Sequence, residues 1–237
     1  MVANRASGMD CTYSELRRSA CVVDVEDSLF AEQGGICAYT GHRLRLQKAD
    51  PNTNTARDVG FHIEHPTPQD YCTAQNGDYG KDADYQNMVA CWPRPNCGFE
   101  PAYGARRKGN WPSPQEEASF VSPLGSDCSA RFMFNHRGEI ACAIKGDQAA
   151  AKTIEEIGLD HKTLEELRRK AIRGAFNPSG RPLRLNEARR LQTQLDRDFQ
   201  TLDAGGNVQL AAFCFVIRSA LDREIRKLEG IGIERYR

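Results

Sequence analysis

The sequence has no long hydrophobic run. Its 237 residues are 40% hydrophobic and 27% charged, and no apolar stretch approaches the length of a membrane span. The opening stretch MVANRASGMDCTYSELRRSA also lacks the apolar segment of a secretory signal. We see no internal repeat and no low-complexity tract. We therefore expect a cytoplasmic globular protein of one large domain or two modest ones, with no membrane association.

The nine cysteines lack the compact spacing and even number of a disulfide framework. In a reducing compartment such cysteines are buried as small hydrophobes or bind a metal, rather than forming crosslinks.

The net charge is zero, but charge is unevenly distributed along the chain. Residues 1–100 hold 14 acidic and 9 basic side chains, a balance of −5, whereas residues 162–197 hold 10 basic and 4 acidic side chains, a balance of +6. The basic segment either faces a polyanion or is a solvated helical surface. Charge alone therefore neither supports nor excludes a nucleic-acid partner.

The first half of the chain mixes helix, strand and loop signals. A short amphipathic helix is predicted over residues 24–34, where a Gly-Gly pair stops it. Residues 36–47 and 59–65 are strand-like, and residues 66–90 are polar and rich in turn residues. We expect the last of these to form a long surface loop, and a loop of that length is usually functional or mobile.

The second half is predicted to be mostly helical after a hairpin. Residues 131–144 form two apolar runs joined by the turn sequence Asn-His-Arg-Gly, and the three prolines of residues 112–127 indicate a linker or wrapping segment. Helices are predicted over residues 153–176, 185–202 and 208–230. In the last one an apolar face serves the core or a partner helix: Phe213, Ile217, Leu221, Ile225 and Leu228. The predicted class is α+β.

The stretch FHIEHPTPQ, residues 61–69, carries a glutamate and two histidines at a strand end. Phosphodiester hydrolysis needs a water nucleophile, a base near it and a cation that offsets charge on the phosphate. A histidine suits the base, and a carboxylate can hold the cation. Adjacent strand side chains point to opposite faces, so Glu64 and His65 act together only where the strand breaks, and Pro66 and Pro68 supply that break.

Asn87 in DYQNMVAC and Lys108 in ARRKGNW follow this pair in the order of an HNH nuclease, and the sequence resembles that family. The resemblance implies a ββα-metal core within residues 1–111. It implies that His65 is the general base, that Glu64 is a ligand of a catalytic Mg²⁺ or Mn²⁺, and that Asn87 orients the loop that holds the histidine.

The end of this pattern departs from the family. The last metal ligand usually lies about one helical turn before the final lysine, where this chain has Gly-Ala-Arg-Arg, and Glu100 and Asn110 are the nearest replacements. Arg106, Arg107 and Lys108 either contact a nucleic-acid phosphate or belong to a solvated loop.

Many HNH proteins also carry a structural zinc frame. Here Cys37 has no cysteine three residues later, but His42 can replace it, and Cys91 and Cys97 supply a later pair. The resemblance thus implies a structural Zn²⁺ held by Cys37, His42, Cys91 and Cys97, with simple burial of these thiols as the alternative.

A more specific resemblance extends over residues 28–173. The ordered stretches EQGGICAYTG, FHIEHPTPQ, DYQNMVAC and RRKGN, followed by SFVSPLGSDCSARFMFNHRGEI and AAAKTIEEIGLDHKTLEELRRKAI, resemble the PtuB-like nuclease subunit of Septu and retron-associated anti-phage systems. This implies a hetero-oligomer with an SMC/ABC-like ATPase subunit, PtuA, and a DNA or RNA substrate. Residues 112–148 would then be a linker and hairpin, and residues 149–237 a helical, partner-binding region.

Two other interpretations of the same residues remain. His62-Ile-Glu64 matches half of a zinc nucleobase deaminase site, but the cysteines at 91 and 97 are too far apart and no proline precedes the first. A zinc-supported binding module that keeps the HNH frame without activity is the second alternative.

Overall fold

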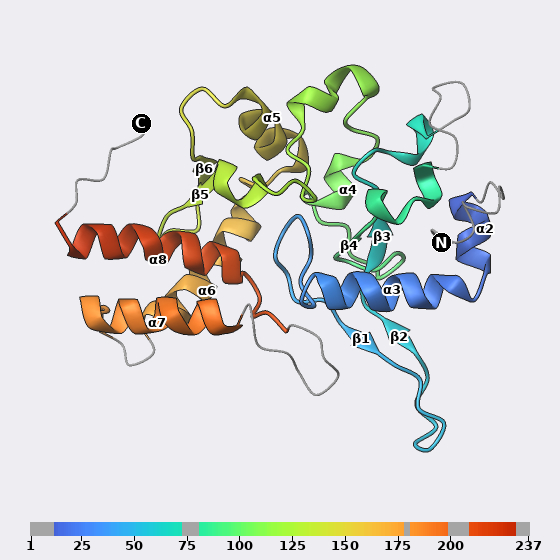
Figure 1. Cartoon of the computed structure of the whole chain (residues 1–237), viewed down its shortest axis with the longest axis horizontal. Coiled ribbons are helices and arrows are strands. Elements are labelled where there is room, and N and C mark those ends of the chain that lie inside the picture. The colour runs from blue at the N-terminus through green and yellow to red at the C-terminus, as the bar shows by residue number, and fades with distance from the viewer. Residues whose placement is uncertain (1–11, 73–80, 178–180, 199–208, 231–237) are drawn as a thin grey trace.

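The computed structural model describes residues 12–72, 81–177, 181–198 and 209–230 (Figure 1). It is a mixture of helices and small antiparallel sheets, which confirms the α+β class. The described strands form three two-stranded sheets, β1–β2, β3–β4 and β5–β6. Among the described helices, none has the length and apolar character needed to cross a bilayer.

The N-terminal part is helical. Helix α2 (Tyr13–Arg18) begins with a capping box in which Thr12 and Glu15 satisfy each other's backbone N–H groups. Helix α3 (Cys21–Glu32) confirms the helix predicted over 24–34 and begins three residues earlier. Gly34 stops it at φ +61°, and a Cβ there would meet the Leu210 side chain at 2.6 Å. Glycine at this position therefore provides both the left-handed turn and room for the C-terminal segment.

The strand predicted over residues 36–47 is mostly a turn. Gly41 has φ +76° and its N–H donates to the Cys37 carbonyl at 2.9 Å, so the chain folds back before it extends. Only β1 (Leu46–Gln47) is a strand, and it pairs with β2 (Asp58–Val59) at the base of an arm that projects from the body (Figure 1).

Strand β3 (His62–Glu64) pairs in antiparallel register with β4 (Val89–Cys91). The predicted loop between them includes three 3₁₀ turns in its described part, η1 (Gln69–Tyr71), η3 (Lys81–Ala83) and η4 (Tyr85–Asn87). Residues 73–80 lie outside the described residues. Helix α4 (Ala105–Lys108) follows β4.

The proline-rich segment wraps the protein and does not act as a free linker. Its 3₁₀ helix η5 (Pro114–Ser119) packs on helix α5 (Gln148–Ile157), and the Val121 N–H donates to Thr153 Oγ1 at 2.8 Å. The predicted hairpin is present as β5 (Phe132–Phe134) and β6 (Ile140–Cys142), preceded by η6 (Cys128–Arg131).

The single helix predicted over residues 153–176 is wrong, because the chain forms two helices there. Helix α5 ends at Gly158, which is left-handed at φ +65°, and α6 (Lys162–Phe176) begins after His161, whose Nδ1 accepts from the Thr163 N–H. A glycine ends a helix readily in this conformation, and a side-chain acceptor then restarts one.

Helices α7 (Leu185–Asp198) and α8 (Cys214–Leu228) pack against each other, and α8 also packs on α6 and β5. The last four residues of the helix predicted over 185–202 lie outside the described residues. Helix α8 begins at residue 214 and not at 208, because Phe213 is left-handed at φ +59°.

One buried cluster contains residues from all three predicted segments. It includes Leu29 and Ile63 from the first segment, Phe134 from the second, and Leu164 and Leu221 from the third. The helical C-terminal region therefore shares a single core with the residues expected to form the nuclease frame.

Candidate active site at the end of strand β3

A buried lysine ties the end of β3 to helix α4. The Lys108 side chain is 0% exposed, and its Nζ donates to Glu64 Oε1 at 2.9 Å and to the His65 carbonyl at 2.9 Å. An ammonium group this deep is tolerated only with paired acceptors, and here it has one charged and one neutral acceptor. Lys108 thus offsets the charge of Glu64 and holds the backbone where the strand breaks.

His62 and Glu64 lie on the same face of β3, because alternate residues of a strand point the same way. The His62 Nδ1 lies 2.6 Å from the Pro93 carbonyl, which can only accept, so Nδ1 carries the proton. The other ring nitrogen, Nε2, lies 3.7 Å from Glu64 Oε2. Burial acts to raise the pKa of Glu64, but neighbouring His62 and the charge of Lys108 outweigh burial and lower this pKa.

His65 follows the strand and is 4% exposed. Its Nε2 lies 2.8 Å from the Asp82 carbonyl, and the Gln69 side-chain amide lies 2.9 Å from Nδ1. The Tyr13 ring meets the imidazole edge-on with centroids 4.5 Å apart. The Tyr13 N–H donates to Asp82 Oδ2 at 3.0 Å, so helix α2 and η3 together hold this ring.

These contacts fix the protonation of His65. A carbonyl oxygen requires the N–H to be on Nε2, which leaves the Nδ1 lone pair as the acceptor for the Gln69 amide. Burial lowers the pKa of His65, and the hydrogen bond to Asp82 opposes this only in part. The ring is therefore neutral at pH 7, with its basic nitrogen covered by Gln69, which is exposed.

Asn87 ends the η4 turn, two residues before β4, and holds the chain that follows His65. Its Oδ1 accepts from the Thr67 N–H at 2.8 Å, and its Nδ2 donates to the Thr67 carbonyl at 3.0 Å and to the Lys81 carbonyl at 3.3 Å. Asn87 is 6% exposed, so these hydrogen bonds are shielded from water. The side chain links the segment after β3 to the η3 turn that supports His65.

Glu64 and His62 are the two side chains at this site that could act as ligands of a divalent cation. Glu64 Oε2 and His62 Nε2 face each other, and the Nδ1–H of His62 is directed at a backbone carbonyl, as in most metal-bound histidines. The described residues contain no group of three or more His, Cys, Asp or Glu side chains that could hold a metal ion. Two protein ligands suffice only where water and substrate phosphate complete the shell, which is common for Mg²⁺.

The predicted phosphate-binding cluster is divided. Arg106 and Arg107 are exposed, whereas Lys108 points inward to Glu64. The candidate replacement ligand Asn110 donates its amide to the Asp70 carboxylate, and Glu100 is exposed. The cluster is thus split between two exposed arginines and a lysine that lies within the site.

The predicted zinc ligands are brought together only in part. The Cys37 Sγ accepts from the Trp92 N–H at 3.3 Å and contacts the Cys91 thiol. Burial acts to raise the pKa of Cys37, but hydrogen bonds from Cys91, Thr40 and Trp92 lower this pKa to about 6. Burial raises the pKa of Cys91 well above its usual value, so one thiol donates to the other.

The other two predicted ligands have different surroundings. The His42 ring stacks on Trp92 with centroids 4.3 Å apart, and its Nδ1 shares a hydrogen bond with Thr40 Oγ1 at 2.8 Å. Cys97 is exposed, and its thiol donates to the Phe99 carbonyl. Cys37 and Cys91 therefore form a buried thiol pair that neither His42 nor Cys97 joins.

Three neighbours of the site were not among the predicted site residues. One is His62, whose i, i+2 spacing to Glu64 was a readable signal for a shared face. The other two are Gln69, in the η1 turn, and Tyr13, in helix α2, which both contact His65. No local sequence pattern predicts either contact.

A scan of protein-family models gives no match to this chain, and a search of curated proteins finds no similar sequence.

Proposed function

We propose that this protein is a metal-dependent HNH-type endonuclease that hydrolyses phosphodiester bonds of nucleic acid. The observation that carries the proposal is the convergence of polar residues from three separate parts of the sequence. Glu64, His65, Asn87 and Lys108 meet where β3 ends, linked by Lys108 and by the Asn87 hydrogen bonds to Thr67. Their order along the chain is that of the HNH pattern.

His65 is the proposed general base. The Asp82 carbonyl holds its Nε2–H and orients the ring, so Nδ1 is the nitrogen that would take a proton from water. Gln69 covers Nδ1 and has to move away before water can reach it. Because burial keeps the pKa of His65 low, the ring is already in its basic form at neutral pH.

Glu64 and His62 would hold the divalent cation through Oε2 and Nε2. The cation, when bound, would offset charge on the phosphate and the leaving oxygen. Lys108 keeps Glu64 ionised and fixed, and the exposed Arg106 and Arg107 on the same helix would contact the nucleic-acid backbone.

The resemblance to PtuB-like subunits extends the proposal to a biological role. We propose that the protein works with an SMC/ABC-like ATPase in a two-component anti-phage system, with DNA or RNA as substrate. Helices α6 and α7, which lie in the basic region of residues 162–197, are the proposed contribution to assembly.

A second candidate is an inactive binding module on the same frame. The observation that favours it is that both His65 ring nitrogens are occupied and that Lys108 already neutralises Glu64. In this case the polar cluster would serve only to hold the strand end and its loop.

The test is cleavage by the purified full chain, alone and with its ATPase, on plasmid DNA and on total tRNA with Mg²⁺ or Mn²⁺. His65→Ala should reduce the rate by about 100-fold or more, because a general base contributes factors of this size. His136→Ala, at an exposed histidine in the hairpin turn, is the matched control and should keep full activity.

Two outcomes would count against the assignment. Cleavage by His65→Ala at the rate of the unmodified protein would reject His65 as the base. Absence of cleavage on both substrates, with a folded protein and the ATPase present, would favour the binding module.

A further inference from the structure

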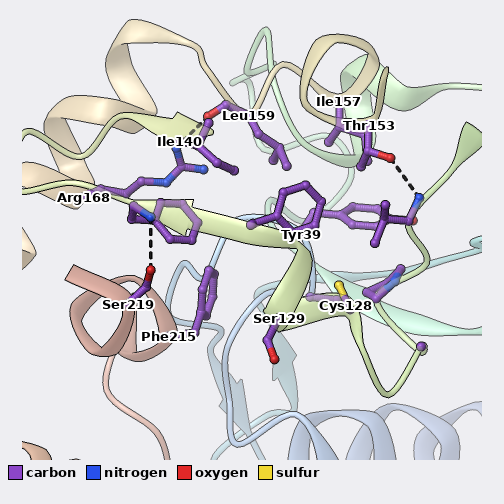
Figure 2. A pocket seen from close by; sticks show the side chains of 16 residues that line it. Tyr39, Cys128, Ser129, Ile140, Thr153, Ile157, Leu159, Arg168, Phe215 and Ser219 are labelled. Atoms are coloured by element: carbon purple, nitrogen blue, oxygen red, sulfur yellow. Dashed lines mark hydrogen bonds between the residues drawn. The ribbon is translucent and has the colours of Figure 1, made fainter. Parts of the chain in front are cut away.

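A cavity lies away from Glu64, and its polar side chains have no role in the proposed nuclease. It encloses about 300 Å³ between the turn at Tyr39, the β5–β6 hairpin, and helices α5, α6 and α8 (Figure 2). Its wall is largely aromatic and aliphatic, with rings from Tyr39, Phe132, Phe134 and Phe215. A cavity of this size with a few polar groups in an apolar lining is typical of small-molecule sites.

Arg168 of helix α6 lines this cavity and is 1% exposed. Its Nη1 donates to the Leu159 carbonyl at 2.6 Å, and its guanidinium lies over the Phe134 ring, 5.0 Å from the centroid. Its Nε is buried and has no hydrogen-bond partner among the described residues. No ion pair of Arg168 with a carboxylate is found in the described part of the chain either, so the charge is only weakly compensated.

Tyr39 supplies a second polar group in the cavity wall that lacks a hydrogen-bond partner among the described residues. The residue is 7% exposed, and its hydroxyl is buried with no hydrogen-bond partner among the residues described. Figure 2 shows Tyr39 in the middle of the lining side chains, with Arg168 entering from α6. One cavity thus holds two donors, a guanidinium and a phenol, that the fold does not satisfy.

A buried, unpaired charge is costly, and packing alone does not explain it. A core that needed only volume at position 168 would use methionine or leucine, because an isolated buried cation loses its hydration. Burial lowers the pKa of Arg168 to about 10, so the guanidinium still carries its charge at neutral pH. An anion that enters the cavity would supply the acceptors that the fold withholds.

We propose that this cavity binds a small organic anion, with a carboxylate or phosphate head on Arg168 and an aromatic body against Phe132, Phe134 and Phe215. The guanidinium matches either head, because its planar donors suit both. The aromatic lining favours a flat, apolar body. The site is independent of the nuclease proposal, because Arg168 is not among the residues that contact Glu64 or His65.

The experiment is calorimetric titration of the full chain with benzoate and with phenyl phosphate, which separate the two head groups. Benzyl alcohol serves as the neutral match. The anion that fits should bind saturably, raise the midpoint of thermal unfolding, and bind at least about tenfold more tightly than benzyl alcohol, since hydrogen bonds to charged groups are the strong ones.

Variants then assign the binding. Arg168→Met should weaken anion binding at least about tenfold while leaving benzyl alcohol unaffected, and Arg168→Lys, which keeps the charge but not the planar donors, should weaken it severalfold. Arg169→Met, at an exposed neighbour on the same helix, is the control and should not change binding. If Arg168→Met does not fold, Arg168→Lys and the comparison of anion with alcohol decide the question.

The proposal is overturned if neither anion binds saturably, if benzyl alcohol binds as well as both anions, or if the anion binds the folded Arg168→Met variant as tightly as the unmodified protein.

Discussion

Replacing Lys108 by methionine should strongly destabilise the protein. The methionine keeps most of the side-chain volume but removes the ammonium that donates to Glu64 and to the His65 carbonyl, each at 2.9 Å. Breaking a buried ion pair by removing one partner costs about 3–5 kcal/mol. Because the Glu64 side chain is 17% exposed and still faces His62, we expect the lower end, about 3 kcal/mol.

A double-mutant cycle separates the charge pair from packing. Glu64→Gln removes the charge that Lys108→Met leaves uncompensated, so the double variant should be more stable than the two single losses predict, by about 2 kcal/mol. The assay is urea unfolding followed by tryptophan fluorescence. An unchanged slope of the unfolding free energy against urea concentration (the m value) checks that only the stability has changed. Lys170→Met, at an exposed lysine on α6, is the control and should change stability by less than about 0.5 kcal/mol.

Either of two results would refute this reasoning. A loss below about 1 kcal/mol for Lys108→Met would mean that the ammonium is not buried against Glu64 as described. Strict additivity in the cycle would mean that the two side chains do not interact, whatever each contributes alone.

Three further predictions concern other parts of the chain. Burial lowers the pKa of His42 to about 4, so between about pH 6.5 and 4 the unfolded chain binds a proton that the folded chain does not bind. The free energy of unfolding should therefore fall by up to about 3 kcal/mol as the pH is lowered over that window. Chemical unfolding at several pH values should show this loss, and His42→Gln should remove most of the pH dependence. Gln69→Ala should uncover Nδ1 of His65 and raise the rate at which diethyl pyrocarbonate modifies that residue several times, as measured by peptide mass spectrometry; an unchanged rate would mean that Gln69 does not cover the ring. Gly158→Ala should lower the free energy of unfolding by about 1–2 kcal/mol, because φ is +65° and a Cβ would lie 2.6 Å from Arg107 Cδ. Gly174→Ala, inside α6 with open space around it, should instead raise it by about 0.5–1 kcal/mol, and urea unfolding of both variants checks these changes.

Local sequence signals were sufficient to predict those elements whose conformation is set by their own residues. The hairpin over 131–144 was predictable because its turn sequence and flanking apolar runs are contiguous. Helix α3 was predictable from its apolar spacing and its Gly-Gly stop. The break at Gly158 was readable too, since a glycine within a helical pattern is a common stop, but the strong periodicity on either side concealed it.

The strand predicted over 36–47 failed for a different reason. Its apolar residues serve a tight turn at Gly41 that packs on the start of α8, and a Cβ on Gly41 would lie 2.7 Å from the Phe215 ring. That contact joins residues far apart in the sequence, so no window around Gly41 contains the information.

For the candidate site, the resemblance to HNH nucleases implied which residues would gather and not how they would interact. Asn87 was expected to fasten the loop after the strand, and its hydrogen bonds to Thr67 are of that kind. Lys108 was expected on the surface beside two arginines, yet α4 turns it inward. The direction of a side chain on a four-residue helix depends on how the helix docks, which sequence pattern does not encode.

The C-terminal helices cannot be treated as an appendage to the strand-bearing half. The Phe213 N–H donates to the Gly41 carbonyl and the Leu210 N–H to the Gly34 carbonyl, both at 2.9 Å, so the segment leading into α8 closes the turns that precede β1. Ser219 on α8 accepts from the Phe134 N–H of β5 at 3.1 Å. Removing α8 would expose these backbone groups and the apolar face of the same core that supports β3 and β4. A partner bound to the helical region would therefore contact a part of the chain that shares its buried core with β3 and β4.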